Sequence, residues 1–407
     1  MQEDKGVFSV VDRRLWVMIL TVFISIKAGL AQDKITPDFQ LELQIENRHF
    51  LKEGLYPGQE RNFFSLSARP ELEWEWDDGD KGIKVSLFGR WDQHDDRRTH
   101  FDIRELYYQQ VNGNLEFSVG LKKIFWGVTE SVHLVDIINQ TDQVESFDGE
   151  QKLGQPMAHM SYLSSFGTFD FFYLPYVRKR QFPSSEGRLR FPVAVERDDL
   201  VIDSRNEEWR PSGAFKWSHY VGLLDVGVSY FHGVGREPLF LDLQSEAPGL
   251  FYPIIHQAGL ELQATTGPVL WKVESIYRHA DVQDFTAVVA GFEYTFGNVK
   301  SSGIDIGLIG EYLYDERDEL AISSFANDIF TGVRLAFNDV QSTEFLAGAI
   351  FDLEESTKVY SVETSRRIGS SWKAEVEARI FEEVAQEEFL YFFREDSFIR
   401  FSVSKFF

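Results

Sequence analysis

The sequence predicts an all-β fold, a transmembrane antiparallel barrel of about 18 strands with short periplasmic turns and long outer loops. Three observations favour this fold class. Apolar and polar side chains alternate along many segments, short and long connections alternate along the chain, and the N-terminus has the pattern of an export signal. The alternation alone also fits a soluble sandwich, because any half-buried sheet has one apolar and one polar face. The connections and the export signal favour the membrane.

The clearest alternation occurs at residues 372–380. Trp372 and Val376 share one strand face there, whereas Glu375 and Arg379 share the other, because successive strand side chains point to opposite faces. We expect the apolar face to contact lipid and the charged face to line the lumen. Similar alternation predicts strands at 39–46, 64–76, 83–91, 115–122, 258–264, 288–296, 304–314 and 399–407.

Two segments depart from the regular pattern. Pro70 interrupts the strand predicted at 64–76, and we expect a bulge or bend there because proline cannot donate a ladder hydrogen bond. Residues 100–108 alternate poorly, which leaves their facing open.

The connections between the predicted strands differ in length in a regular way. Short polar turns are predicted at 77–82, 112–114, 164–167, 265–268, 297–303, 338–342 and 369–371. Longer connections are predicted at 47–61, 127–155, 177–208, 234–253 and 315–327. Because the two kinds alternate along most of the chain, the strands are expected to run up and down between two ends, which gives an even strand number.

Residues 1–31 are expected to be a cleaved signal peptide, and residues 32–407 a single outer-membrane barrel. Arg13 and Arg14 precede an apolar run, and small residues follow it up to Ala31. The run is about 12 residues long, whereas a spanning helix needs about 20, so a membrane anchor is the less favoured alternative. We therefore expect cleavage near Ala31 and localisation in the outer membrane of a Gram-negative bacterium.

The composition fits a barrel, argues against nucleic acid as a partner, and excludes thiol chemistry. The chain has 37 Phe, 15 Tyr and 9 Trp, an excess that aromatic girdles at two membrane interfaces require. Its net charge of -24 argues against nucleic acid, which needs clustered Lys and Arg. Because there is no Cys, neither a disulfide nor a thiolate metal site is possible.

The C-terminal segment also fits an outer-membrane barrel. Its predicted strand alternates and stops on Phe407, which resembles the signal that the barrel-assembly machinery recognises. Lys405 breaks the apolar face, but a charge near the interface costs only about 0–1 kcal/mol. The expected partners are therefore this machinery, outer-membrane lipid and lipopolysaccharide.

The predicted lumen face is polar and mostly acidic. Its candidate charged residues are Arg69, Lys84, Arg90, Lys122, Glu261, Glu293, Glu311, Glu375, Glu377 and Arg379. Carboxylate rings favour cations, so we expect a weak cation preference. Alternatively, opposite charges only cross-link the lumen walls.

Residues 127–155 form a connection that is too long and too apolar for a simple exposed loop. We expect it to fold into the barrel mouth as a constriction, although a lid packed outside the pore is an alternative. The candidate constriction residues are Trp126, Asp136, Asn139 and Asp142. The last three could also offer oxygen ligands to calcium, but their spacing is not that of an EF-hand, and no metal site is expected.

The region around this connection contains four short motifs. They are Arg104-Glu105-Leu106-Tyr107, Gly120 with Lys122, Trp126-Gly127, and Asp136-Ile137-Ile138-Asn139-Gln140-Thr141-Asp142. Together they resemble a family of uncharacterised porin-like outer-membrane proteins, related in style to alginate-export barrels. Leu106, Lys123 and Gln140 depart from that family's Ala, Gln and Pro. The resemblance implies a barrel with an inward loop, but no particular substrate.

A basic cluster stands out in this acidic chain. It consists of Arg178, Lys179, Arg180, Arg188 and Arg190. One interpretation is a patch for an anionic solute or for lipopolysaccharide phosphates. The alternative is a solvated loop whose charges pair with nearby carboxylates such as Glu207 and Glu208.

These features together predict a porin-like channel for small polar or ionic solutes. The alternatives are a non-conducting receptor or assembly component, and a transporter of hydrophobic compounds, for which the inward Phe88, Leu346 and Ile350 are few. No nucleophile elbow, zinc-protease motif, phosphate loop or cofactor motif is present, and the histidines are scattered along the sequence. We therefore expect neither an enzyme nor a cofactor.

Overall fold

The computed structural model describes residues 37–407 except 193, 196–198, 241–249 and 318–324. The predicted signal peptide, residues 1–31, lies outside the described residues. Within them, no helix is long and apolar enough to cross a bilayer.

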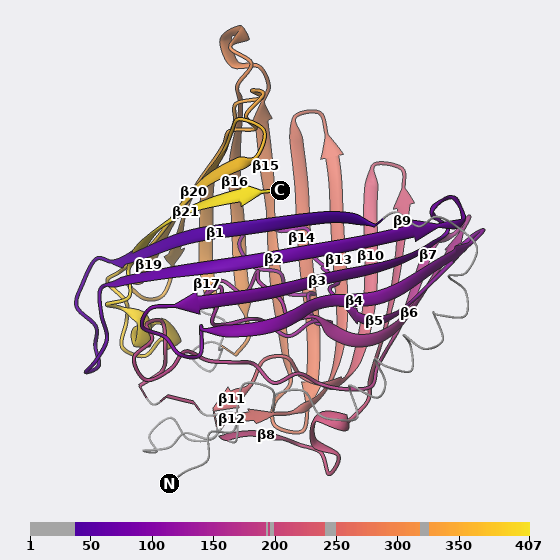
Figure 1. Ribbon diagram of the computed structural model, residues 1–407, viewed down its shortest axis with the longest axis horizontal. Helices are drawn as coiled ribbons and strands as arrows, with labels where there is room; N and C mark the ends of the chain where they lie inside the picture. Colours follow the sequence, from indigo (N-terminus) through magenta and orange to yellow (C-terminus); the bar gives the residue numbers. More distant parts are fainter. Residues whose placement is uncertain (1–36, 193, 196–198, 241–249, 318–324) are drawn as a thin grey trace.

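The described chain forms a closed barrel of 18 antiparallel strands, as predicted (Figure 1). Consecutive barrel strands pair with each other, and β1 pairs with β21 to close the wall. The barrel strands are β1 (Asp38–Phe50), β2 (Asn62–Trp76), β3 (Lys81–Asp92), β4 (His100–Asn112), β5 (Leu115–Lys122), β6 (Gln155–Ser164), β7 (Gly167–Leu174), β9 (Ser212–Val221), β10 (Leu224–Val234), β13 (Ile254–Thr266), β14 (Val269–Ala280), β15 (Phe285–Phe296), β16 (Asp305–Asp315), β17 (Asn327–Ala336), β18 (Glu344–Asp352), β19 (Lys358–Ile368), β20 (Trp372–Glu382) and β21 (Phe398–Phe406).

Side chains on each strand alternate between the lumen and the outer surface, as the sequence predicts. On β20, Trp372 and Ile380 are exposed outside, whereas Arg379 contacts a loop inside the barrel. At the closing seam, the backbone of Phe407 exchanges hydrogen bonds with Leu41 (3.0 and 3.3 Å). The ammonium of Lys405 lies over the Trp372 ring on the outer surface.

The two irregular segments have different structural causes. Pro70 lies where the β2–β3 ladder is interrupted between the pairs Ala68–Gly89 and Glu71–Ser86, although the register does not shift there. Between β3 and β4 the register does shift, which leaves Arg104 as an extra residue. This β-bulge explains why residues 100–108 alternate poorly, because an extra residue reverses the facing of those after it.

The two ends of the barrel differ, and we call them the turn end and the loop end. The turn end has the connections 77–80, 113–114, 165–166, 222–223, 267–268, 297–304, 337–343 and 369–371. The loop end has 51–61, 93–99, 123–154, 175–211, 235–253, 281–284, 316–326, 353–357 and 383–397. The predicted alternation is therefore present, although 281–284 and 353–357 are short and the long 383–397 was not predicted.

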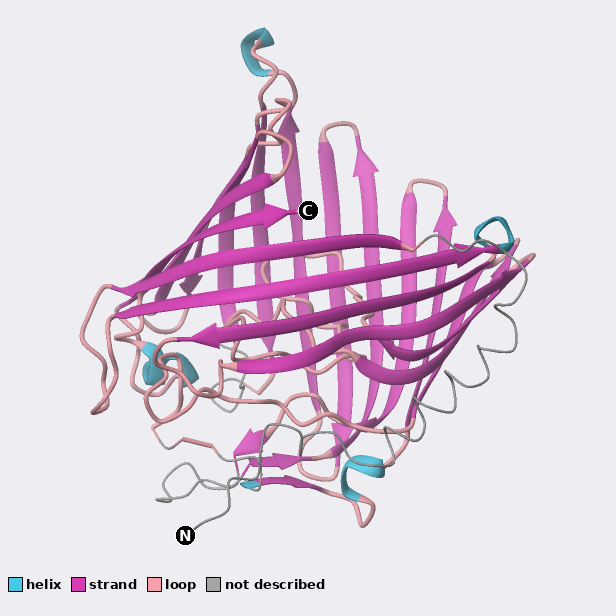
Figure 2. Cartoon of the chain, viewed as in Figure 1, coloured by secondary structure: helices cyan, strands magenta, loops and turns pink. Residues whose placement is uncertain are grey.

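Some loop-end connections carry structure of their own. A small three-stranded sheet consists of β8 (Leu200–Ile202), β11 (Leu239–Phe240) and β12 (Leu250–Tyr252). Among the described residues, short helical segments at the rims include η2 (Asp77–Gly79), η4 (Glu207–Trp209), η5 (Val299–Ser301) and η7 (Phe389–Phe393) (Figure 2). Leu250, Tyr252, Leu390 and Phe393 are buried in one apolar cluster, so these connections fill the loop end.

Candidate functional site

The connection between β5 and β6, residues 123–154, lies inside the barrel, and we call it the inward loop. Its apolar residues Val135, Ile137 and Ile138 are buried against the wall residues Ile276 and Phe285. This contact gives the loop the packing partner that its sequence requires. The structure therefore places the loop in the lumen and not as a lid outside.

Glu274 of β14 holds the first turn of the inward loop. One carboxylate oxygen accepts hydrogen bonds from the backbone amides of Val128 (2.6 Å) and Thr129 (3.0 Å), and from the Thr129 hydroxyl (2.7 Å). Gly127 permits this approach, because its φ is +149° and a Cβ there would lie 3.1 Å from the same oxygen. Glu274 has no exposed surface, so these donors replace the water it has lost.

A second wall carboxylate continues the attachment. Glu311 of β16 accepts hydrogen bonds from the amides of Glu130 (2.8 Å) and Ser131 (2.9 Å), and from the Ser131 hydroxyl (2.5 Å). Glu130 in turn pairs with Arg334 of β17 (2.6 Å). We call Glu274 and Glu311 the latch, since together they hold residues 128–131 against the wall.

Further along, the inward loop is bound to other sides of the barrel. Glu145 pairs with Arg90 of β3 (2.9 Å), and the Val144 carbonyl accepts a hydrogen bond from Arg98 (3.1 Å). Asp148 pairs with Arg379 of β20 (2.7 Å). Attachment to opposite walls means that the loop crosses the lumen instead of lining one side.

Two of the four predicted constriction residues line a cavity, and the other two help to hold the inward loop in place. Asp136 and Asn139 line a cavity beside the loop, Asp136 pairing with Lys152 (3.1 Å). Trp126 packs edge-on against Phe172 of β7, and Asp142 pairs with Arg104 (2.5 Å).

The calcium alternative finds no geometric support at these residues. The Asn139 amide is occupied by Ile124 N–H and by the carbonyl oxygens of Lys122 and Leu153. Among the described residues, no group of three or more His, Asp or Glu side chains is arranged to hold a metal ion.

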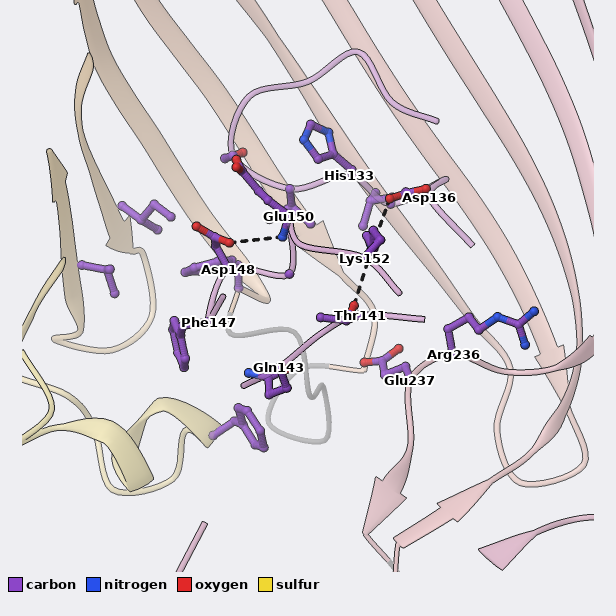
Figure 3. Close-up of a pocket in the computed structure, with 18 of the residues that line it drawn as sticks. His133, Asp136, Thr141, Gln143, Phe147, Asp148, Glu150, Lys152, Arg236 and Glu237 are labelled. Atoms are coloured by element: carbon purple, nitrogen blue, oxygen red, sulfur yellow. Dashed lines mark hydrogen bonds and ion pairs between the residues drawn. The ribbon is translucent and has the colours of Figure 1, made fainter. Parts of the chain in front are cut away.

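The inward loop separates two spaces in the lumen. One cavity of about 370 Å³ is lined by loop residues from Glu130 to Lys152 and by wall residues such as Phe330 (Figure 3). Another, of about 480 Å³, is lined by Val128 and by wall residues near the turn end, including Lys216 and Glu261. The segment 128–131, which the latch holds, therefore lies between a space at the loop end and a space at the turn end.

The predicted lumen charges engage partners across the walls. Their partners are Glu42 for Arg69, Glu105 for Lys84, Glu46 and Glu145 for Arg90, Glu116 for Lys122, Lys216 for Glu261, Lys272 and Arg334 for Glu293, Lys373 for Glu375, Arg400 and Arg379 for Glu377, and Asp148 and Glu363 for Arg379. Glu311 instead accepts from the inward loop. Most of these pairs tie neighbouring strands and the loop together, which is the cross-linking alternative raised by the sequence. The pairs Lys122–Glu116 and Lys373–Glu375 instead lie within single strands.

The basic cluster does not form a surface patch. Arg188 is buried and pairs with Asp396 (2.6 Å), and Arg190 is buried with its guanidinium on carbonyl oxygens. Arg178 pairs with Asp102 (2.7 Å), and Lys179 pairs with Glu208 (3.4 Å). The interpretation as an accessible phosphate-binding patch is therefore corrected at Arg188 and Arg190, which are buried. The pairing of Lys179 with Glu208 fits the alternative that the sequence raised.

Two functional features escaped the sequence analysis. Glu274 had no local signal, because it meets Val128 across 146 residues of sequence. The histidines also are not all scattered in space. His232, His256 and His279 lie in register on β10, β13 and β14, with the first two rings stacked at 4.1 Å.

Glu150, near the end of the inward loop, titrates close to neutrality. The adjacent Asp148 carboxylate, together with burial and Glu363, raises the pKa of Glu150 to about 7, while Arg379 and His133 act in the opposite direction. Burial acts to lower the pKa of His133, but the Glu274 carboxylate, 3.8 Å from the His133 Nδ1, raises this pKa overall.

Lowering the pH from 8 to 6 is expected to reduce any cation preference of the barrel. Glu150 gains a proton over this range, which makes the lumen less negative. The Glu150→Gln variant should resemble the low-pH protein and show a smaller pH step. Reversal potentials in a salt gradient measure this, with exposed Glu387→Gln as the control. An unchanged pH step in Glu150→Gln would contradict the assignment.

No protein-family model matches the chain, and no curated protein matches it. Solved structures do resemble it. OccK5 (OpdH) of Pseudomonas aeruginosa matches with a TM-score of 0.54 over 91% of this chain and 97% of that one, at 11% identity. OpdQ of the same organism matches at 0.52 over 92% and 99%, with 12% identity. A BenF-like porin from Pseudomonas fluorescens Pf-5 matches at 0.52 over 92% and 98%, with 10% identity. At these identities the likeness establishes the fold, which is the barrel fold of these proteins.

Proposed function

We propose that this protein is a porin-like outer-membrane channel for small solutes, in which the inward loop narrows the passage. The observation that carries the proposal is a closed barrel whose lumen is crossed by a loop latched to Glu274 and Glu311. Barrels of this size leave room for an aqueous channel. An attached loop within such a lumen restricts the solutes that pass.

The orientation follows from the unequal ends. In bacterial outer-membrane barrels the short turns face the periplasm and the longer loops face outward. The turn end is therefore assigned to the periplasm, and Phe407 at the seam to recognition by the assembly machinery. The resemblance of residues 104–142 to the porin-like family is compatible with this proposal.

The passage is proposed to favour cations weakly. Glu150 and Glu363 supply negative charge beside the loop, but Arg379 and Lys152 lie close to them. Because the cations lining the cavity largely offset its carboxylates, strong selectivity is not expected.

Conductance in planar lipid bilayers tests the proposal. The purified protein, without its signal peptide, is expected to open ion-conducting channels with a small positive reversal potential for cations in a salt gradient. Heat-modified mobility on denaturing gels verifies that the barrel is folded. A folded barrel that never conducts would contradict the channel. It would support the alternative of a receptor or assembly component, and the packed loop end would then serve that function.

A further inference from the structure

The cavity beside the inward loop has an aromatic wall assembled from distant parts of the chain. Phe147 of the inward loop contacts Phe381 of β20 at 5.5 Å and Phe393 of η7 at 5.0 Å between ring centroids, both edge to face. Phe191 contacts Phe389 at 5.4 Å. Figure 3 shows Phe147 at this cavity, with Gln143, Asp148 and Glu150 of the same loop around it.

The charged groups around this cavity mostly neutralise one another. Arg278 and Arg317 both pair with Glu237 (2.7 and 3.1 Å). Arg379 pairs with Asp148, and Lys152 pairs with Asp136. These paired charges leave little net attraction for a small inorganic ion, whereas an apolar ring gains free energy by leaving water.

One edge of the cavity offers a hydrogen-bond donor. The guanidinium of Arg180 donates to the side-chain oxygens of Gln140 and Gln143, both at 3.3 Å, and to the Arg236 carbonyl at 3.0 Å. All three of these acceptors are neutral groups. An oxygen atom on a bound molecule can replace one of the two longer contacts.

We propose that this cavity is a binding site for a small aromatic compound that carries one oxygen-bearing substituent. The ring would lie against Phe147, Phe381 and Phe393, and the oxygen would accept a hydrogen bond from Arg180. The volume of about 370 Å³ lies within the range of small-molecule sites. This inference rests on the proposed channel function, because it names the class of solute that the channel would carry.

Saturation-transfer NMR on the full barrel in lipid nanodiscs tests the site. The probe is benzyl alcohol, empty nanodiscs give the background, and the ring-saturated cyclohexylmethanol tests the need for an aromatic ring. We expect the aromatic probe to bind and its analogue to bind more weakly. Phe147→Leu, which keeps an apolar side chain but removes the ring, should weaken binding by about tenfold because the bound ring loses its aromatic contact with Phe147.

The control is the same substitution at Phe166, which is 75% exposed at the turn end. Phe166→Leu is expected to bind the probe as the unmodified protein does. Equal binding in the two variants, or no transfer above empty nanodiscs, would overturn the site. Conductance of the same preparation keeps the two proposals distinct. A barrel that conducts without binding refutes only the solute class, whereas one that binds without conducting refutes only the channel.

Discussion

Replacing Glu274 by glutamine is expected to release the inward loop and raise the conductance of the barrel. The substitution keeps the size of the side chain and one acceptor oxygen for Val128 and Thr129, but it removes the charge and places an NH2 group against the Val135 N–H. Hydrogen bonds to a charged group are stronger than neutral ones by about 1 kcal/mol each, so the three remaining bonds together weaken by about 3 kcal/mol. Since about 1.4 kcal/mol changes an equilibrium tenfold, the released state should become populated.

Single-channel recordings measure this release as a larger mean conductance or as new transitions to a larger level. Glu293→Gln is the matched control, because Glu293 also lies on the lumen wall but pairs with Lys272 and Arg334 and not with the loop backbone. Glu311→Gln should act in the same direction as Glu274→Gln. If both latch variants conduct like the unmodified protein, the loop does not control the passage.

Placing arginine at Val376 is expected to lower the free energy of unfolding by about 2–4 kcal/mol, the cost of a cation near the bilayer midplane. Val376 lies in the middle of β20, opposite Thr364 and Phe401 in the neighbouring strands. Phe401 is 53% exposed on the outer surface, which places Val376 on the same lipid-facing side. Urea titration in phospholipid vesicles, followed by tryptophan fluorescence, measures the change.

Gln263→Arg serves as the control for this experiment. Gln263 lines the turn-end cavity together with Glu261 and Asp225, so an arginine there enters water beside carboxylates. Its expected effect on unfolding is small. Equal destabilisation by the two substitutions would mean that Val376 does not face lipid.

Much of the candidate site was open to prediction, but its attachments were not. The apolar content of residues 127–155 favours a loop inside the barrel over a lid outside it, because long structureless loops are uncommon unless they are functional. The contacts of the loop with the wall decide between the two. Asp136 and Asn139, predicted as constriction residues, line the cavity beside the inward loop. The sequence leaves Arg180 between two interpretations, an accessible patch and a solvated loop paired with carboxylates, because charge in a sequence does not reveal burial.

The sequence by itself determined the wall of this protein. Along a strand, the direction of the side chains repeats every two residues. The facing of the side chains, the number of strands and the arrangement of the two barrel ends therefore follow from local patterns. Only the tertiary structure decided what fills the lumen inside this wall. The latch joins Glu274 to Val128, and the aromatic wall joins Phe147 to Phe381 and Phe393. These contacts bridge the lumen between segments far apart in the chain, and closure of the barrel, which no local pattern encodes, is what brings them together.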